Sequence, residues 1–167
     1  MLHPRSSGSL GCSDRELIQT FHLEKQSRLI VTGEKTLFRF PSRIEAVNEA
    51  AASVAAILDT VGATDDVKFA VDMAVREAVT NAVLHGNKLD ELKTVELQLT
   101  TASEAVEILV GDEGSGFKPE EVPDPTAAEN ILKTSGRGIF FMRNFMDTVD
   151  WSVRPEGGTL VRLTKKL

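Results

Sequence analysis

The chain has 167 residues, of which 41% are hydrophobic and 26% are charged, and its formal net charge is −6. These values are typical of one soluble globular domain with a core of its own, and the negative charge argues against a direct nucleic-acid surface. The single cysteine, Cys12, excludes an internal disulfide and a cysteine metal cluster. Because no apolar run reaches transmembrane length and no signal pattern opens the chain, we expect a cytoplasmic protein with no membrane partner.

The first third of the chain separates into an extension and the start of a folded domain. Residues 1–33 are predicted to be an N-terminal extension that is partly disordered, because its first part is rich in serine and glycine. Residues 34–167 are predicted to be the folded domain. It opens with an alternating strand over 36–40, which Pro41 ends. Ser42 and Glu45 then match the capping-box pattern, which predicts Ser42 as the N-cap of a helix that ends near Thr60.

A second helix is predicted to begin at Thr64, where acidic residues in the first turn favour the helix dipole. One face of this helix is apolar, and the next stripe has residues at intervals of four: Met73, Glu77, Asn81 and His85. Glu77 and Asn81 are therefore able to supply a base and a metal ligand from the same side. A solvated polar stripe is the alternative interpretation. We expect Gly86 to end the helix in the left-handed conformation, and His85 to be structural.

The rest of the chain alternates between hairpins and one further helix. Residues 94–100 and 105–110 predict one antiparallel hairpin, and 148–153 and 159–164 predict another. Between them, residues 118–135 contain three prolines and little periodicity. Loops of this length are often lids, and a plain disordered excursion is the alternative interpretation. A short amphipathic helix follows it. Since helices do not alternate with every strand, we predict an α+β fold, a two-layer sandwich with a mostly antiparallel sheet and helices on one face.

One glycine-containing segment comes directly after a predicted strand and has the sequence Asp112-Glu113-Gly114-Ser115-Gly116. Glycines allow the backbone to approach a flat ligand without a clash at Cβ. The Asp112 carboxylate is able to accept a hydrogen bond from an exocyclic amine such as that of adenine. A simple turn is the alternative interpretation of this segment.

A second glycine-containing segment, Gly136-Arg137-Gly138, opens the short helix after the predicted lid. Free N–H groups at a helix start bind phosphate oxygens, and Arg137 would add a charge-assisted contact. The alternative is a tight turn with a solvent-facing arginine. The chain contains neither a P-loop nor a dinucleotide-binding glycine fingerprint, so both of those nucleotide sites are excluded.

Together, the segments 77–87, 112–117 and 135–139 resemble in order the N, G1 and G2 boxes of the GHKL ATP-binding fold, the Bergerat fold of gyrase and histidine kinases. The resemblance is strongest to the single-domain bacterial anti-sigma factor serine kinases. Three further segments resemble that branch too: Phe40-Pro41-Ser42-Arg43, Asp124-Pro125 and Gly157-Gly158-Thr159. It covers about 36–167 and identifies residues 34–167 as a histidine kinase-like ATP-binding domain. The histidine kinases themselves fit less well, because residues 1–35 are too short and aperiodic for their phosphoacceptor helices.

The resemblance implies a role for each motif residue. Glu77 would be the catalytic base, and Asn81 would coordinate Mg²⁺ and help to bind ATP. Asp112 would bind the adenine amine, with Gly114, Gly116 and Thr159 beside it, Thr159 acting through water and Asp112. The phosphates would be held by the second glycine segment: Gly136, Arg137 and Gly138.

The resemblance also implies partners and an activity. We expect an ATP- and Mg²⁺-dependent serine/threonine protein kinase that phosphorylates a STAS-domain antagonist, sequesters a sigma factor and forms a homodimer. The alternative is a nucleotide-dependent switch module of the same fold, with little kinase activity and a partner other than a sigma factor. Because a pure binding module has no need of a base, Glu77 favours the kinase. A structural protein with chance glycine turns is a third hypothesis.

Overall fold

The computed structural model describes residues 33–116 and 137–167, and the structural statements below concern those residues. The predicted lid and all but the last residue of the extension lie outside them. The elements in chain order are β1 (Glu34–Pro41), α1 (Ala46–Thr60), α2 (Asp65–Asn81), the π-helical turn η1 (Ala82–Gly86), β2 (Thr94–Thr101), β3 (Ala105–Gly111), α3 (Arg137–Phe145), β4 (Thr148–Val153) and β5 (Thr159–Lys166).

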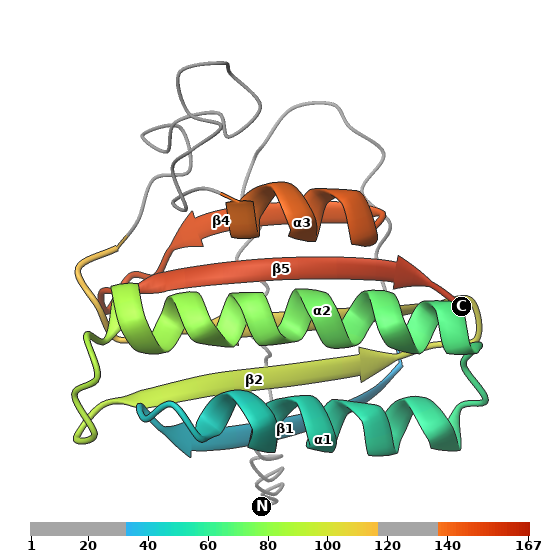
Figure 1. Ribbon diagram of the computed structural model, residues 1–167, viewed down its shortest axis with the longest axis horizontal. Coiled ribbons are helices and arrows are strands. Elements are labelled where there is room, and N and C mark those ends of the chain that lie inside the picture. Colours follow the sequence, from blue (N-terminus) through green and yellow to red (C-terminus); the bar gives the residue numbers. More distant parts are fainter. Residues whose placement is uncertain (1–32, 117–136) are drawn as a thin grey trace, which may run out of the picture.

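The five strands form one sheet in the order β1-β2-β3-β5-β4, and every neighbouring pair is antiparallel. Figure 1 shows α1, α2 and α3 side by side in front of this sheet, so the described helices form a single layer on one face. Both predicted hairpins are present, as β2 with β3 and β4 with β5. The predicted two-layer α+β fold is therefore confirmed.

The core lies between the sheet and the helices because both layers are apolar on the facing side. Along β2, the alternating residues Val95, Leu97 and Leu99 are fully buried, as their period of two requires. The apolar stripe of α2, which includes Val71 and Val79, covers them at helical spacing. None of the described helices is both long and apolar enough to span a membrane.

The start of α1 differs from the prediction. Its N-cap position is Glu45 and not Ser42, and no side chain caps the helix. Ser42 is buried in the connection from β1, where its N–H donates to the Lys93 carbonyl at 3.0 Å. Its Oγ has no hydrogen-bond partner among the described residues. Because Arg43 N–H turns back to the Pro41 carbonyl, the chain makes an extra turn before the helix begins. By contrast, Thr64 does cap α2, since its Oγ1 accepts a hydrogen bond from the Val67 N–H.

The end of α2 also differs from the prediction. Gly86 does not adopt the left-handed conformation, and the positive φ angles in this segment belong to Lys88 and Leu89. The helix widens into the π-helical turn η1, in which Asn87 N–H donates to the Ala82 carbonyl five residues earlier. Turns of this kind are frequent at functional sites. Glycine is required at position 86 for a different reason, because this residue lies close to the Asp112 carboxylate.

Candidate functional site

Asp112 lies at the C-terminal end of β3 and is held by backbone groups from two segments. Its side chain is only 4% exposed. One carboxylate oxygen, Oδ1, accepts hydrogen bonds from Gly114 N–H at 2.8 Å and Thr159 N–H at 3.1 Å. The Asp112 N–H donates in turn to the Thr159 carbonyl at 3.0 Å. Within the described residues, Oδ2 has no such donor, so it is the oxygen available to a ligand.

Gly86 brings the end of α2 against this carboxylate. A Cβ atom at Gly86 would lie 2.6 Å from Asp112 Oδ2 and 2.8 Å from Oδ1, which no real side chain tolerates. Because Asp112 is pinned by two N–H donors, its carboxylate has no free direction in which to move. The glycine of the first motif therefore makes room for the aspartate of the second, and the two motifs form one site.

Asn87 ties three segments together beside this carboxylate, although its side chain had no predicted role. It is 1% exposed. Its Oδ1 accepts a hydrogen bond from Glu113 N–H at 2.8 Å, and its Nδ2 donates to the Thr94 carbonyl at 3.1 Å. The end of η1, the start of β2 and the turn after β3 are thus joined by one carboxamide.

Replacing Asn87 with alanine is expected to lower the free energy of unfolding by about 2 kcal/mol, because the backbone groups of Thr94 and Glu113 lose buried partners. Chemical denaturation monitored by circular dichroism measures this loss. The matched control is Asn144→Ala, since Asn144 is exposed and only donates to the Phe140 carbonyl of its own helix. An Asn87→Ala variant as stable as Asn144→Ala would contradict the assigned role.

Arg154 contacts the backbone of Asp112, and no sequence pattern had predicted this role for it. Its Nη1 donates to the Asp112 carbonyl at 3.3 Å, and its Nη2 pairs with Glu96 at 3.0 Å and Glu156 at 2.7 Å. Burial alone would lower the pKa of this guanidinium, but the hydrogen bonds and charges of Glu156 and Glu96 raise it. The pKa of Glu96 lies below its ordinary value, first because Arg39 donates a hydrogen bond to it. The cluster therefore stays charged at neutral pH.

Glu77 and Asn81 lie one turn apart on the half-buried side of α2, as predicted. The start of α3 packs closely against Glu77: a Cβ atom at Gly138 would overlap the Glu77 carboxylate. Only glycine leaves space for a carboxylate beside the first turn of this helix. Glu77 of the first motif and Gly138 of the third are thus in contact. The contact between Gly86 and Asp112 joins the first motif to the second in the same way.

The structure describes some of the remaining predicted site residues and not others. Thr159 lies beside Asp112 through the backbone hydrogen bonds given above. Gly116 has a φ of +89° and lies near Val153, at the turn that joins β4 and β5. Gly136 lies outside the described residues, and of Arg137 only the backbone, at the start of α3, is described. The predicted phosphate-binding contacts of these two residues therefore remain predictions.

Metal-binding capacity at this site is limited. Across residues 33–116 and 137–167, no three His, Cys, Asp or Glu side chains come together to hold a metal ion. Asn81 offers one amide oxygen, which is a ligand that Mg²⁺ accepts. A magnesium ion here would take most of its ligands from phosphate and water, as magnesium commonly does at nucleotide sites.

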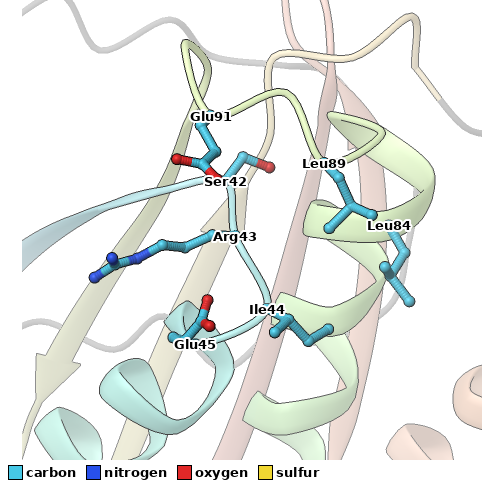
Figure 2. Close-up of a pocket in the computed structure, with 7 residues that line it drawn as sticks. All are labelled: Ser42, Arg43, Ile44, Glu45, Leu84, Leu89 and Glu91. Atoms are coloured by element: carbon cyan, nitrogen blue, oxygen red, sulfur yellow. The ribbon is translucent and has the colours of Figure 1, made fainter.

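A separate hollow of about 390 Å³ lies on the other side of η1. Figure 2 shows that the connection from β1 to α1 and the segment after η1 face each other across it, with Ile44 opposite Leu84 and Leu89. None of the predicted site residues lines this hollow. The candidate site is instead built from two contacts, Gly86 with Asp112 and Gly138 with Glu77, with Thr159 bound to Asp112 and Asn81 one turn along the helix from Glu77.

Comparison with known proteins finds similar sequences over most of the chain. The profile of the histidine kinase-like ATPase domain matches residues 40–165. An anti-sigma F factor of Oceanobacillus iheyensis is 35% identical over 124 residues, which is 72% of this chain and 85% of the relative. An anti-sigma F factor of Clostridium perfringens is 31% identical over 135 residues, 80% and 96% of the two chains. That of Bacillus subtilis is 36% identical over 117 residues, 69% and 80%.

Proposed function

Because the chain belongs to the anti-sigma factor branch of the histidine kinase-like ATPase family, we propose that it is an ATP- and Mg²⁺-dependent serine/threonine protein kinase. Its substrate would be a STAS-domain antagonist, and its second partner a sigma factor that it sequesters. The observation that carries this proposal is that the second and third motifs both contact the segment that carries the first. Asp112 lies against Gly86 in η1, and Gly138 lies against Glu77 in the last turns of α2.

The adenine end of the site is proposed to be Asp112. Its Oδ2 would accept a hydrogen bond from the exocyclic amine, while Oδ1 remains bound to Gly114 and Thr159 N–H. A carboxylate held by two donors cannot rotate to suit a different base. This fixed acceptor favours adenine over a base that carries an oxygen in the same place.

The phosphate end is proposed to lie at Glu77 and Gly138, away from the adenine end, because Glu77 is in α2 while Gly86, which contacts Asp112, is in η1 beyond the end of α2. An elongated nucleoside triphosphate has its base and its terminal phosphate at opposite ends, which suits this separation. The first N–H groups of α3 would face the phosphates, where the helix dipole favours negative charge.

Glu77 is proposed to act as the general base. Its carboxylate would take the proton of the acceptor hydroxyl while that oxygen bonds to the terminal phosphorus, and the bond from phosphorus to the bridging oxygen of ADP would break. A bound Mg²⁺ would supply charge neutralisation of the phosphates in this reaction. Asn81, one turn along α2, would hold that ion through its amide oxygen. Positioning by the fixed helix contributes more than covalent chemistry in transfers of this kind.

The sigma factor and the STAS-domain antagonist are proposed from family membership, as are a homodimer and a cytoplasmic location. No contact with nucleic acid or membrane is part of the proposal. The net charge of −6 supports a protein partner with a basic surface over direct binding to nucleic acid.

The proposal is tested by incubating the purified chain with labelled ATP, Mg²⁺ and candidate STAS-domain proteins from the same organism. Transfer of one phosphate to a single serine or threonine, located by mass spectrometry, is the expected result. The same candidate with that residue replaced by alanine is the control. ATP binding without transfer to any candidate would favour the alternative, a nucleotide-dependent switch module without kinase activity.

A further inference from the structure

Four phenylalanine rings form a continuous row that joins α2 to α3. Phe69 of α2 meets Phe145 of α3 edge to face, with their ring centroids 5.7 Å apart. Phe145 stacks on Phe141 at 6.4 Å, and Phe141 meets Phe140 at 6.1 Å. Three of these rings are on the surface, since Phe69 is 59% exposed, Phe140 42% and Phe141 47%. Figure 1 shows the two helices side by side in the layer in front of the sheet.

The row is part of a larger exposed apolar surface. Met73 follows Phe69 by one turn of α2 and is exposed as well. We call this surface the aromatic patch, and its members are Phe69, Met73, Phe140, Phe141 and Phe145. Single exposed apolar side chains are common on soluble proteins, but a contiguous group of them marks an interaction site. Aromatic residues and methionine are enriched at protein–protein interfaces, so the patch suits a protein partner.

The aromatic patch is continuous with the phosphate end of the candidate site. Phe69, Met73 and Glu77 follow one another at intervals of four on α2, so they lie on one stripe of that helix. At about 1.5 Å per residue, Met73 lies about 6 Å along the axis from Glu77, and Phe69 about 12 Å. On α3, Phe141 is one turn beyond Gly138, which contacts Glu77. Both helices therefore carry the patch outward from the contact that holds Glu77.

We propose that the aromatic patch is the docking surface for the acceptor protein whose hydroxyl is delivered to Glu77. The identity of this partner rests on the proposed kinase function. A protein hydroxyl has to reach Glu77 from the surface, and Glu77 is half-buried where the patch ends. Contacts on the patch would hold the acceptor in place while its hydroxyl lies at the base.

The rim of the aromatic patch indicates the chemistry of the acceptor surface. Asp65 and Asp66 precede Phe69 by four and three residues, and both are exposed. Side chains at these spacings are neighbours on a helix, so the edge of the patch beside Phe69 is acidic. An apolar segment with a lysine or arginine next to it complements both features.

A second copy of the chain is the other occupant to consider. A copy seated on the aromatic patch would also cover the approach to Glu77, which begins one turn from Met73. It would then exclude the acceptor hydroxyl from the base. A homodimer that transfers phosphate therefore has to form through a different face, which leaves this one to the acceptor.

The proposal is tested by titration calorimetry of the full chain against each STAS-domain protein of the same organism. A non-hydrolysable ATP analogue is present, so that binding is measured without transfer. We expect one of these proteins to bind, and Phe69→Ala and Phe141→Ala each to weaken that binding by about 10- to 100-fold, as for buried aromatic anchors of an interface. Affinity for the analogue should not change. Met73→Glu is the further variant if either alanine variant does not fold.

Leu37→Ala is the matched control. Leu37 is an exposed leucine of β1, at the edge of the sheet opposite β4, and its loss should leave acceptor binding unchanged. Replacing Asp65 and Asp66 together with asparagine should weaken binding at low salt and have less effect at high salt, because salt screens exposed charges. If the bound protein is phosphorylated, the patch variants should raise its KM and leave kcat within about twofold.

Three results would overturn the proposal. One is a folded chain that binds the analogue but none of the STAS-domain proteins. Another is acceptor binding that Phe69→Ala and Phe141→Ala leave unchanged, which would place the acceptor elsewhere. The third is a dimer mass by light scattering that both variants convert to a monomer mass, which would assign the aromatic patch to a second copy. By contrast, binding that the variants weaken but that leads to no phosphate transfer with ATP would support the docking surface and contradict the proposed kinase activity.

Discussion

Replacing Glu77 with glutamine is expected to slow phosphoryl transfer by about 10²- to 10⁴-fold, the usual contribution of a general base. Glutamine has the same size as glutamate. This matters because the end of the Glu77 side chain fills the space beside Gly138. ATP binding should remain within about twofold, since adenine and phosphate contacts are made elsewhere. The measurement is the rate at which labelled phosphate moves from ATP to the acceptor protein under single-turnover conditions.

Glu49→Gln is the matched control for this variant. Glu49 is an exposed carboxylate on α1 that pairs with Arg43, away from the proposed site. Its loss should leave the transfer rate unchanged. If Glu77→Gln transfers phosphate as fast as the natural chain, Glu77 is not the base, although ATP binding and the fold would still stand.

Replacing Asp112 with asparagine is expected to weaken ATP binding by about 10- to 100-fold, the value of a hydrogen bond to a charged acceptor. The new amide oxygen is able to keep the hydrogen bonds from Gly114 and Thr159 N–H. The amide nitrogen would then take the place of Oδ2. Its N–H group would face the N–H group of the adenine amine, and no hydrogen bond would form between them. The fold is therefore retained while the proposed base recognition is lost, and titration calorimetry measures the change.

Inosine triphosphate provides an internal control, because it carries an oxygen where ATP carries the amine. The natural chain should prefer ATP, and Asp112→Asn should lose or reverse that preference. Circular dichroism must first show that the variant is folded. An unchanged preference for ATP in a folded variant would mean that Asp112 does not contact the base.

Much of the fold could be predicted because its signals are local. Alternation over β2, β3 and β5 identified the hairpins, and the apolar stripe of α2 identified the helix that carries the site. The two errors have the same origin. Ser42 matches a capping pattern, but its N–H is already bound to Lys93, far along the chain. Gly86 matches a helix-ending pattern, but the reason for glycine is the close approach of Asp112.

The candidate site could be predicted only where a motif marks it. Glu77, Asn81 and Asp112 lie in recognisable segments, and the described contacts place those segments together. Asn87 and Arg154 could not be assigned a role, since their partners Glu113 and Asp112 lie 26 and 42 residues away in the chain. Such pairings depend on strand register and on the π-helical turn, and neither leaves a periodic signal in the sequence.

We propose that this chain binds ATP with Mg²⁺ through Asp112 and Asn81. The most direct test is titration calorimetry of the purified full chain with ATP, with and without Mg²⁺, and with Asn81→Ala alongside. We expect saturable binding with one ATP per chain that strengthens with Mg²⁺, and a smaller Mg²⁺ effect in Asn81→Ala. Absence of ATP binding by a folded chain would contradict the account and would leave a nucleotide-independent interaction module.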